Sequence, residues 1–351
     1  MRYRVRHETI YSYGSDVVHS HQLLHLVPRP SRFQQCLEHR LTISPPTYSR
    51  RDETDAFGNI VTRVEFEHPH RRLEVATDVE VDVHPRPPAP AADSLPWERV
   101  RDSLTYTGHS PGREILEACR FRHESPYVRV KQVFTDYGAE CFPAGRPVLA
   151  CAEALMNKLH RELKYAPGET DIATPLSEVL ETRRGVCQDF AHLMIACLRA
   201  RGLTARYVSG YIRLRAARQA AVVNGANGEA TSMDDAVHGS KAEEPSATLE
   251  ALAPSYDPVL AGVAEADPQM DWVGAGASHA WVSVYSPPFG WVELDPTNNV
   301  YVGTDHIAIA WGRDFGDVSP LRGVILGGGS HHLSVCVTVE PLRDGVTTAA
   351  Q

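Results

Sequence analysis

The residue with the clearest chemical potential is Cys187, in the run Gly-Val-Cys-Gln-Asp-Phe-Ala-His at positions 185 to 192. From this run to Gly202 the apolar residues recur at three- and four-residue steps, which predicts a helix with one buried face that begins near Cys187. The unpaired N–H groups and positive dipole end of a helix N-terminus favour a thiolate, the form of cysteine that attacks carbonyl carbons. Cys187 is therefore the predicted nucleophile. Cys197 falls on the apolar face of the same helix and is predicted to be structural.

A second segment offers a base and an acid. Apolar and polar residues alternate on both sides of Pro287-Pro288-Phe289-Gly290, which predicts two antiparallel strands joined by a tight turn. If the hairpin is centred near Pro287, His279 pairs directly with Asp295, because 279 plus 295 is twice 287. Directly paired residues lie roughly 4.5 to 5.5 Å apart at Cβ, so the carboxylate can hold the imidazole by one nitrogen. A slip of one residue would place the two side chains on opposite faces.

Cys187, His279 and Asp295 together are the predicted nucleophile, base and orienting acid of covalent catalysis. The backbone N–H of Cys187 is the natural first donor of an oxyanion hole. The sequence leaves the second donor open between Tyr165 and Gln188. Further candidates for oxyanion or substrate contacts are therefore Gln188, Tyr165 and Trp281.

These motifs resemble those of the bacterial transglutaminase-like superfamily, whose members are often described as candidate cysteine proteases. The resemblance covers the Cys187 run, the Ser-His-Ala-Trp-Val strand around His279 and the Gly-Trp-Val-Glu-Leu-Asp-Pro-Thr-Asn segment around Asp295. Residues 1 to 83 resemble the N-terminal β-domain of that group, and residues 312 to 324 resemble its tail. The resemblance implies an α+β fold with a papain-like transglutaminase core, in which the helix bearing the cysteine packs on an antiparallel sheet. It also implies that Cys187, His279 and Asp295 are the triad.

The chain divides into four predicted regions. Alternating residues predict an all-β, sandwich-like domain over 1–85, followed by a proline-rich linker with short helices over 86–146. The catalytic core is predicted over 147–325, and a C-terminal strand and tail over 326–351. Within the core, the segment 216–271 carries ten acidic residues and two basic ones, and we expect it to be disordered. It is interpreted either as a mobile lid that selects substrates or as an inert surface excursion.

The composition excludes several classes of protein. With 351 residues, 42% of them hydrophobic and 23% charged, the chain has the make-up of a soluble globular protein. It has no apolar run of about 18 residues and no apolar region after its basic N-terminus, so we expect neither a membrane span nor a secretory signal. Seven cysteines, an odd number, favour reduced thiols and a cytoplasmic location. The net charge of -9 argues against a nucleic-acid partner.

No cofactor or metal is predicted. His19, His21 and His25 are close in sequence, but no cysteine or cluster of carboxylates completes a ligand set around them. A metal enzyme that uses Cys187, His192 and His279 is a weaker alternative, because a helix directs residues five positions apart to different sides.

The predicted function is a peptidase or amidase that acts on a peptide or protein substrate through an acyl-enzyme. The triad alone does not separate hydrolysis from acyl transfer, since both pass through that intermediate. Hydrolysis is favoured because nothing in the chain resembles the calcium-site sequences of animal transglutaminases. An acyl transferase and a non-catalytic protein-binding scaffold of the same fold remain as alternatives, and the oligomeric state is not predicted.

Overall fold

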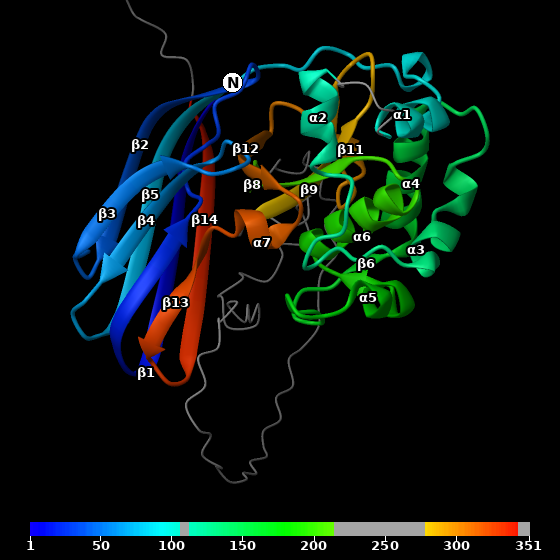
Figure 1. Cartoon of the computed structure of the whole chain (residues 1–351). Helices are drawn as coiled ribbons and strands as arrows, with labels where there is room; N and C mark the ends of the chain where they lie inside the picture. The colour runs from blue at the N-terminus through cyan, green and yellow to red at the C-terminus, as the bar shows by residue number, and fades with distance from the viewer. Residues whose placement is uncertain (106–111, 214–277, 343–351) are drawn as a thin grey trace, which may run out of the picture.

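The computed structural model describes residues 1–105, 112–213 and 278–342 of the protein, in which a strand-rich half lies beside a mixed half (Figure 1). The predicted acidic segment 216–271 lies outside the described residues. No helix of the described residues is long and apolar enough to cross a membrane.

The strand-rich half is built around its first strand. Its seven strands are β1 (Arg2–Leu24), β2 (Gln34–Ser44), β3 (Ser49–Thr54), β4 (Ile60–Phe66), β5 (His70–Val83), β13 (Leu321–Gly327) and β14 (His331–Leu342). The first part of β1 pairs with β5 and β14, and its last part pairs with β4 and β13. Its pairing with β5 shifts between Ser12 and Val17, an irregularity of the kind that bends a strand. Both parts contribute to one apolar cluster, which includes Tyr11, Val17, Leu24, Phe66 and Leu73.

The two C-terminal strands complete this sheet. The predicted division separated residues 326–351 from residues 1–85, whereas β13 and β14 pair with β1 at its two ends. The sequence pattern does predict the last strand itself. It carries no local signal for a partner about 300 positions away, because pairing between distant segments leaves no pattern within either segment.

Among the described residues, the mixed half holds seven α-helices, two short 3-10 helices (Ala91–Asp93 and Ala139–Cys141) and a five-stranded antiparallel sheet. The helices are α1 (Trp97–Ser103), α2 (Arg113–Cys119), α3 (Gln132–Tyr137), α4 (Val148–Glu162), α5 (Leu176–Thr182), α6 (Cys187–Ala200) and α7 (Phe315–Val318). The sheet runs in the order β11 (Val300–Tyr301), β10 (Trp291–Asp295), β9 (His279–Tyr285), β8 (Ala205–Ile212) and β12 (His306–Gly312). Two short strands, β6 (Lys164–Tyr165) and β7 (Arg184–Gly185), pair in parallel beside it.

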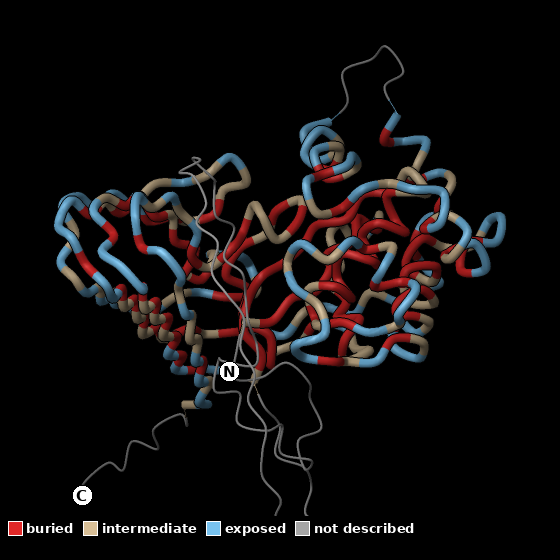
Figure 2. Tube along the Cα trace, turned by 90° about the horizontal axis from the view of Figure 1, so that it is seen from below, coloured by how far each residue is buried: buried red, intermediate tan, exposed pale blue. Residues whose placement is uncertain are grey.

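Helix α6 packs on the antiparallel sheet, which confirms the predicted α+β fold. Its apolar residues share one buried cluster with Ala280, Val282 and Val284, alternate residues of β9. Buried residues are concentrated around this helix and sheet (Figure 2). The helix is almost entirely buried, so tertiary packing rather than helix propensity stabilises it.

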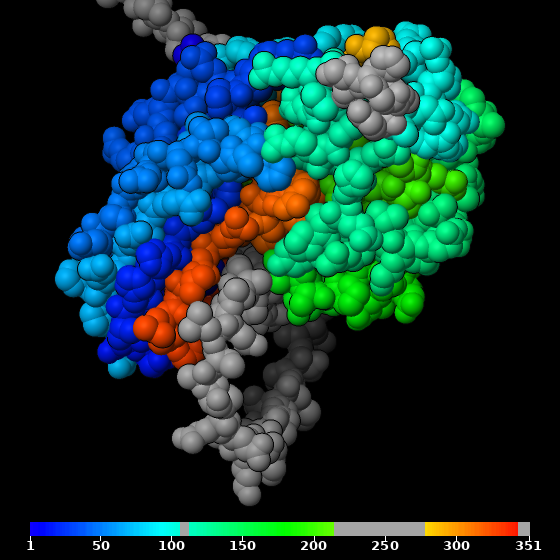
Figure 3. All heavy atoms as spheres, viewed as in Figure 1, coloured from blue at the N-terminus to red at the C-terminus, as the bar shows by residue number. Residues whose placement is uncertain are grey.

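The two halves meet along a broad seam (Figure 3), where side-chain amides of the strand-rich half pair with the backbone of β12. Gln34 accepts the N–H of Ala308 at 2.9 Å and donates to its carbonyl at 2.5 Å. Asn59 does the same for Trp311, at 3.0 and 2.9 Å. These amides satisfy backbone groups that an edge strand would otherwise leave unpaired, and they fix β12 against the strand-rich half.

Candidate active site

Cys187 is the first residue of α6, as the sequence predicts. The preceding residue Val186 is extended, and its N–H donates to Oδ2 of Asp189 at 2.8 Å, so the helix start is capped from within its first turn. Oδ2 also accepts the Thr170 hydroxyl at 2.7 Å. A Cβ atom on Gly185 would lie 2.6 Å from the same oxygen, so only glycine leaves room for this cap. The cap therefore fixes the position of Cys187, which is 9% exposed.

The second part of the site is the pair formed by His279 and Asp295. Nε2 of His279 lies 2.8 Å from Oδ2 of Asp295, and both side chains are buried. The predicted hairpin register is wrong by two residues, since Val282 faces Leu294 and paired numbers add to 576 instead of 574. Asp295 is therefore offset by two residues from the position opposite His279. A shift of two residues keeps a side chain on the same face, so the expected contact still forms.

Charge interactions shift the two pKa values in opposite directions. Burial alone lowers the pKa of His279, but the Asp295 carboxylate and the Cys187 side chain together raise it to about 10. Burial alone raises the pKa of Asp295, but the neighbouring imidazoles hold it far below its usual range. Nδ1 of His279 has no hydrogen-bond partner among the described residues, and it is the nitrogen left for the thiol of Cys187. The arrangement therefore favours an imidazolium beside the sulfur.

His306, at the start of β12, is a member of the site that sequence reasoning missed. Its Nε2 lies 3.2 Å from Oδ2 of Asp295, and the residue is 1% exposed. A histidine that begins an otherwise apolar strand was the only available signal. It gives no indication of contact with a strand three places away in the sheet.

The other predicted contacts divide into two groups. Trp281 is fully buried and donates its indole N–H to Glu293 at 2.7 Å, so it is a packed core residue here, and its contact with substrate stays a prediction. The centre of its ring lies 5.3 Å from that of the His306 ring. Tyr165 and Gln188 are partly exposed, and Tyr165 lies opposite Gly185 in the short parallel pair. Their choice as second oxyanion donor stays a prediction.

His192 belongs to a different environment from the triad candidates. Its Nε2 accepts the N–H of Phe315 at 3.1 Å, and its ring packs against Tyr207 at 4.8 Å. Burial lowers its pKa to about 3, and the charge of Arg199 adds to this effect. It is therefore a neutral core residue. No group of three metal-ligating side chains occurs among the described residues.

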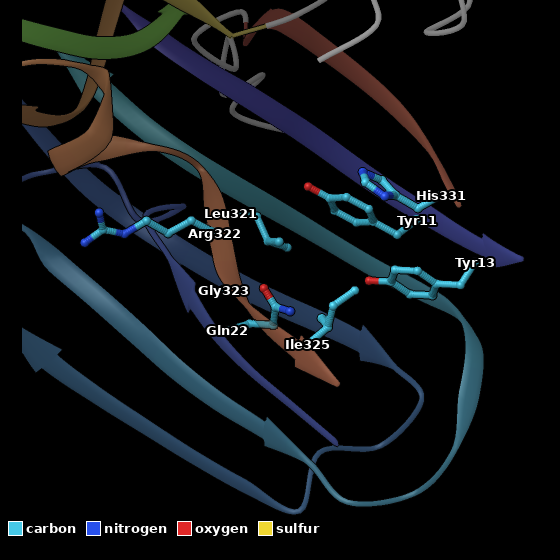
Figure 4. Close-up of a pocket in the computed structure, with 8 residues that line it drawn as sticks. All are labelled: Tyr11, Tyr13, Gln22, Leu321, Arg322, Gly323, Ile325 and His331. Carbon is cyan, nitrogen blue, oxygen red and sulfur yellow. The ribbon is translucent and has the colours of Figure 1, made fainter. Parts of the chain in front are cut away.

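The described residues enclose a small cavity and a larger cleft. A cavity of about 40 Å³ lies in the strand-rich half between Tyr11, Tyr13 and His331 (Figure 4), and none of the triad candidates lines it. A cleft of about 570 Å³ is lined by residues of β1, β4 and β13 and by residues of the mixed half. Its inner wall includes Tyr127, Ile172 and Phe315. The Phe315 ring lies 6.3 Å from that of Tyr207.

Residues of the cleft wall contact α6 and the loop that precedes it. Burial raises the pKa of Tyr207, a neighbour of the cleft residue Phe315, well above its usual value, and Cys187 and Asp189 raise it further. Ile172 lies in the loop that Thr170 ties to the start of α6. Two further residues of the cleft wall contact His192 of α6, since the Tyr127 ring stacks on the imidazole at 6.1 Å and the Phe315 N–H donates to Nε2.

Comparisons with known proteins agree with this architecture. Residues 3–82 match the bacterial transglutaminase-like N-terminal region, and residues 139–296 match the transglutaminase-like superfamily. An uncharacterized protein of Mycobacterium tuberculosis strain H37Rv is 34% identical over 97% of this chain and 93% of its own length. One from Mycobacterium leprae is 28% identical over 97% and 99%. The crystal structure of a candidate cysteine protease from Cytophaga hutchinsonii has a similar fold, with a TM-score of 0.63 and 17% identity over 99% of this chain and 92% of that one.

Proposed function

Since this chain belongs to the transglutaminase-like superfamily, we propose that it is a cysteine peptidase or amidase that acts on a peptide or protein substrate. Cys187 is the nucleophile, His279 the acid and base, and Asp295 the residue that orients the imidazole. The observation that carries this proposal is the buried His279–Asp295 contact of 2.8 Å beside the first residue of α6.

In the first half of the reaction, the Cys187 thiolate attacks the carbonyl carbon of an amide. The negative charge that develops on the oxygen is stabilised by the backbone N–H of Cys187 at the helix start, together with a second donor from Tyr165 or Gln188. His279 donates the proton on Nδ1 to the nitrogen of the leaving amine, and the C–N bond breaks. An acyl thioester on Cys187 remains.

In the second half, His279 takes a proton from water, and the resulting hydroxide attacks the thioester. The C–S bond breaks, the acid product leaves and the thiolate forms again. Asp295 keeps Nε2 occupied throughout, so that Nδ1 is the nitrogen that exchanges protons. We propose that a polymeric substrate lies along the cleft of about 570 Å³, which is within the size range of ligand-binding clefts.

An acyl transferase differs only in the second half, where an amine replaces water. A non-catalytic scaffold is the alternative from another class. The three residues argue against a scaffold, because burying a charged pair costs free energy that protein binding alone does not require.

The proposal is tested by following acylation with p-nitrophenyl acetate, using intact mass and peptide mapping. We expect one acetyl group to accumulate on Cys187 and to be lost with time. Cys187→Ala should abolish it, whereas Cys336→Ala, which removes an exposed thiol, should leave it unchanged. Methylamine added to the reaction separates the two chemistries, since N-methylacetamide indicates transfer and acetate indicates hydrolysis. Absence of acetyl-Cys187 in the folded protein would contradict the enzyme proposal and favour a scaffold.

We also propose a cytoplasmic location, which the seven free cysteines support. Cell fractionation with an antibody against the full chain checks this proposal, and recovery outside the cytoplasmic fraction would contradict it.

A further inference from the structure

The Asp295 carboxylate accepts hydrogen bonds on both of its oxygens. Oδ1 accepts the backbone N–H groups of Thr297 at 3.0 Å and Asn298 at 3.2 Å. Oδ2 accepts the side-chain amide of Asn298 at 2.8 Å and contacts Nε2 of His279 at 2.8 Å and Nε2 of His306 at 3.2 Å. One oxygen atom is therefore shared by two imidazoles.

The two imidazoles carry different charges. The pKa of His279 is raised to about 10, so this ring holds the additional proton. Burial lowers the pKa of His306, and together with the charges of His279 and Arg86 it outweighs the Asp295 carboxylate, which raises that pKa. An ionised carboxylate only accepts hydrogen bonds, so the neutral ring of His306 has its hydrogen on Nε2 and donates it to Oδ2.

We propose that His306 is a positioning residue that fixes Asp295 for its contact with His279 and connects the strand-rich half of the protein to the reacting pair. The inference rests on the proposed function, because the orientation of His279 matters chiefly if this ring transfers protons.

The connection runs through β12, which begins at His306. Two residues further on, Ala308 is clamped by the side-chain amide of Gln34. Asp305, the residue before His306, accepts a hydrogen bond from the hydroxyl of Tyr3 at 3.1 Å. Gln34 and Tyr3 both belong to the strand-rich half, so the segment that carries His306 is held on each side of it by that half.

A third contact fixes the His306 ring. It meets the Trp281 ring nearly at right angles, at 80°, and Trp281 is itself held by its bond to Glu293. The imidazole therefore reaches Oδ2 from a rigid position. Without the N–H of His306, the donors left to Oδ2 of Asp295 among the described residues are those of His279 and Asn298. The carboxylate can then rotate, and it is less well stabilised as an anion.

The experiment compares three substitutions of His306 in the full chain. His306→Gln keeps a side-chain N–H at a similar reach, His306→Asn keeps an amide that is too short, and His306→Leu removes the donor. The readout is the rate at which limiting iodoacetamide labels Cys187 between pH 5 and 9, with thermal unfolding measured in parallel. His25→Leu is the matched control, because His25 is a buried histidine that bonds Ser319 instead of Asp295.

We expect His306→Asn and His306→Leu to lower the labelling rate at pH 6 by about tenfold, the effect of one hydrogen bond to a charged group. The acid limb of the pH profile should move to higher pH in both variants. His306→Gln should stay within about twofold of wild type, since it restores the donor. The His25 control should keep the wild-type profile. If His306→Leu does not fold, the comparison of the Asn and Gln variants decides the question.

Two results separate this inference from the proposed function. If wild-type Cys187 shows no preferential labelling, the proposed function fails and this inference fails with it. If wild-type Cys187 is preferentially labelled but the Asn and Gln variants have the same acid limb as wild type, only the role of His306 is overturned. Equal loss of rate in the Gln and Asn variants, without a shift of the acid limb, would mean that His306 merely fills space and would overturn the inference too.

Discussion

At the scale of single residues, the site is a buried ion pair that depends on a dense set of donors. A carboxylate taken out of water costs several kcal/mol unless charges and hydrogen bonds compensate for it. Asp295 has such compensation in two backbone N–H groups, the Asn298 amide and two imidazoles. It therefore stays ionised despite complete burial and raises the pKa of the His279 ring.

The raised pKa of His279 predicts a pH-dependent contribution to stability. A group whose pKa is higher in the folded chain than in the unfolded chain stabilises the fold fully below its unfolded pKa. For His279, with an ordinary value of 6.5 and a folded value of about 10, this contribution is complete below pH 6.5 and is lost as the pH rises to about 10. His279→Gln should cost on the order of 3 to 5 kcal/mol at pH 6, since it leaves the Asp295 charge without its main partner. The difference from wild type should shrink toward pH 10.

Urea unfolding of both proteins across this pH range measures the difference. His332→Gln, a substitution of an exposed histidine, serves as the control and should show no such trend. A difference between wild type and His279→Gln that stays constant from pH 6 to pH 10 would contradict the assigned charge state.

Residue types and local spacing predict some of these roles and not others. Cys187 and the His279–Asp295 contact follow from a helix start and from strand alternation, both of which are local patterns. The role of His306 depends on how the sheet brings separate strands together. Trp281 shares its face with His279, but the pattern cannot show that Glu293 and Arg86 enclose this face. Alternation separates two faces of a strand and does not tell which of them meets solvent.

At the scale of elements, β8 allows side chains of neighbouring strands to converge. Gly210 of β8 pairs with His279 on one side and with Ala308 on the other. A Cβ atom at this position would lie 2.4 Å from the Trp281 ring and 2.2 Å from the carbonyl oxygen of Ile307. The absence of a side chain at Gly210 therefore lets the Trp281 ring approach β8 closely while it also contacts the His306 ring.

Gly210→Ala is expected to destabilise the protein by about 1 to 3 kcal/mol, because neither a backbone carbonyl nor a packed tryptophan can yield easily. It should also slow the labelling of Cys187, as Trp281 is pushed against the His306 ring. Gly303→Ala is the matched control, since nothing lies within 4 Å of a Cβ atom there. Urea unfolding and iodoacetamide labelling of both variants check this. Equal stability of the two variants would show that β8 tolerates a side chain at position 210.

At the scale of the whole molecule, β13 and β14 complete the sheet of the strand-rich half, and side chains of that half bond the edge strand β12 of the mixed half. β13 and β14 cover both parts of β1, although they lie beyond the two matched regions, 3–82 and 139–296. Gln34 and Asn59 act as single-residue substitutes for a neighbouring strand along β12. Neither feature could be predicted, because each depends on contacts between residues more than 200 positions apart.

Deletion of residues 319–351 should abolish cooperative unfolding, since it exposes the apolar cluster around Val17 and leaves β1 with partners on one side only, β5 and β4. Deletion of residues 343–351 alone, which lie outside the described residues, should preserve the wild-type transition. Circular dichroism during thermal unfolding distinguishes the two proteins. A cooperative transition in the larger deletion would contradict the assignment of β13 and β14 to the fold of the first half.

The most direct test of an activated Cys187–His279 pair is a competition among the seven cysteines for limiting iodoacetamide at pH 6. Peptide mass mapping measures the labelling of each cysteine in wild type and in His279→Ala. Exposure alone predicts that Cys336, the exposed thiol, is labelled first, since Cys187 is only 9% exposed. An activated cysteine–histidine pair predicts the opposite order, because the helix start and the His279 ring make the Cys187 sulfur a better nucleophile. This advantage should disappear in His279→Ala. Labelling of Cys336 ahead of Cys187 in wild type, or an advantage of Cys187 that survives without His279, would contradict an activated cysteine–histidine pair.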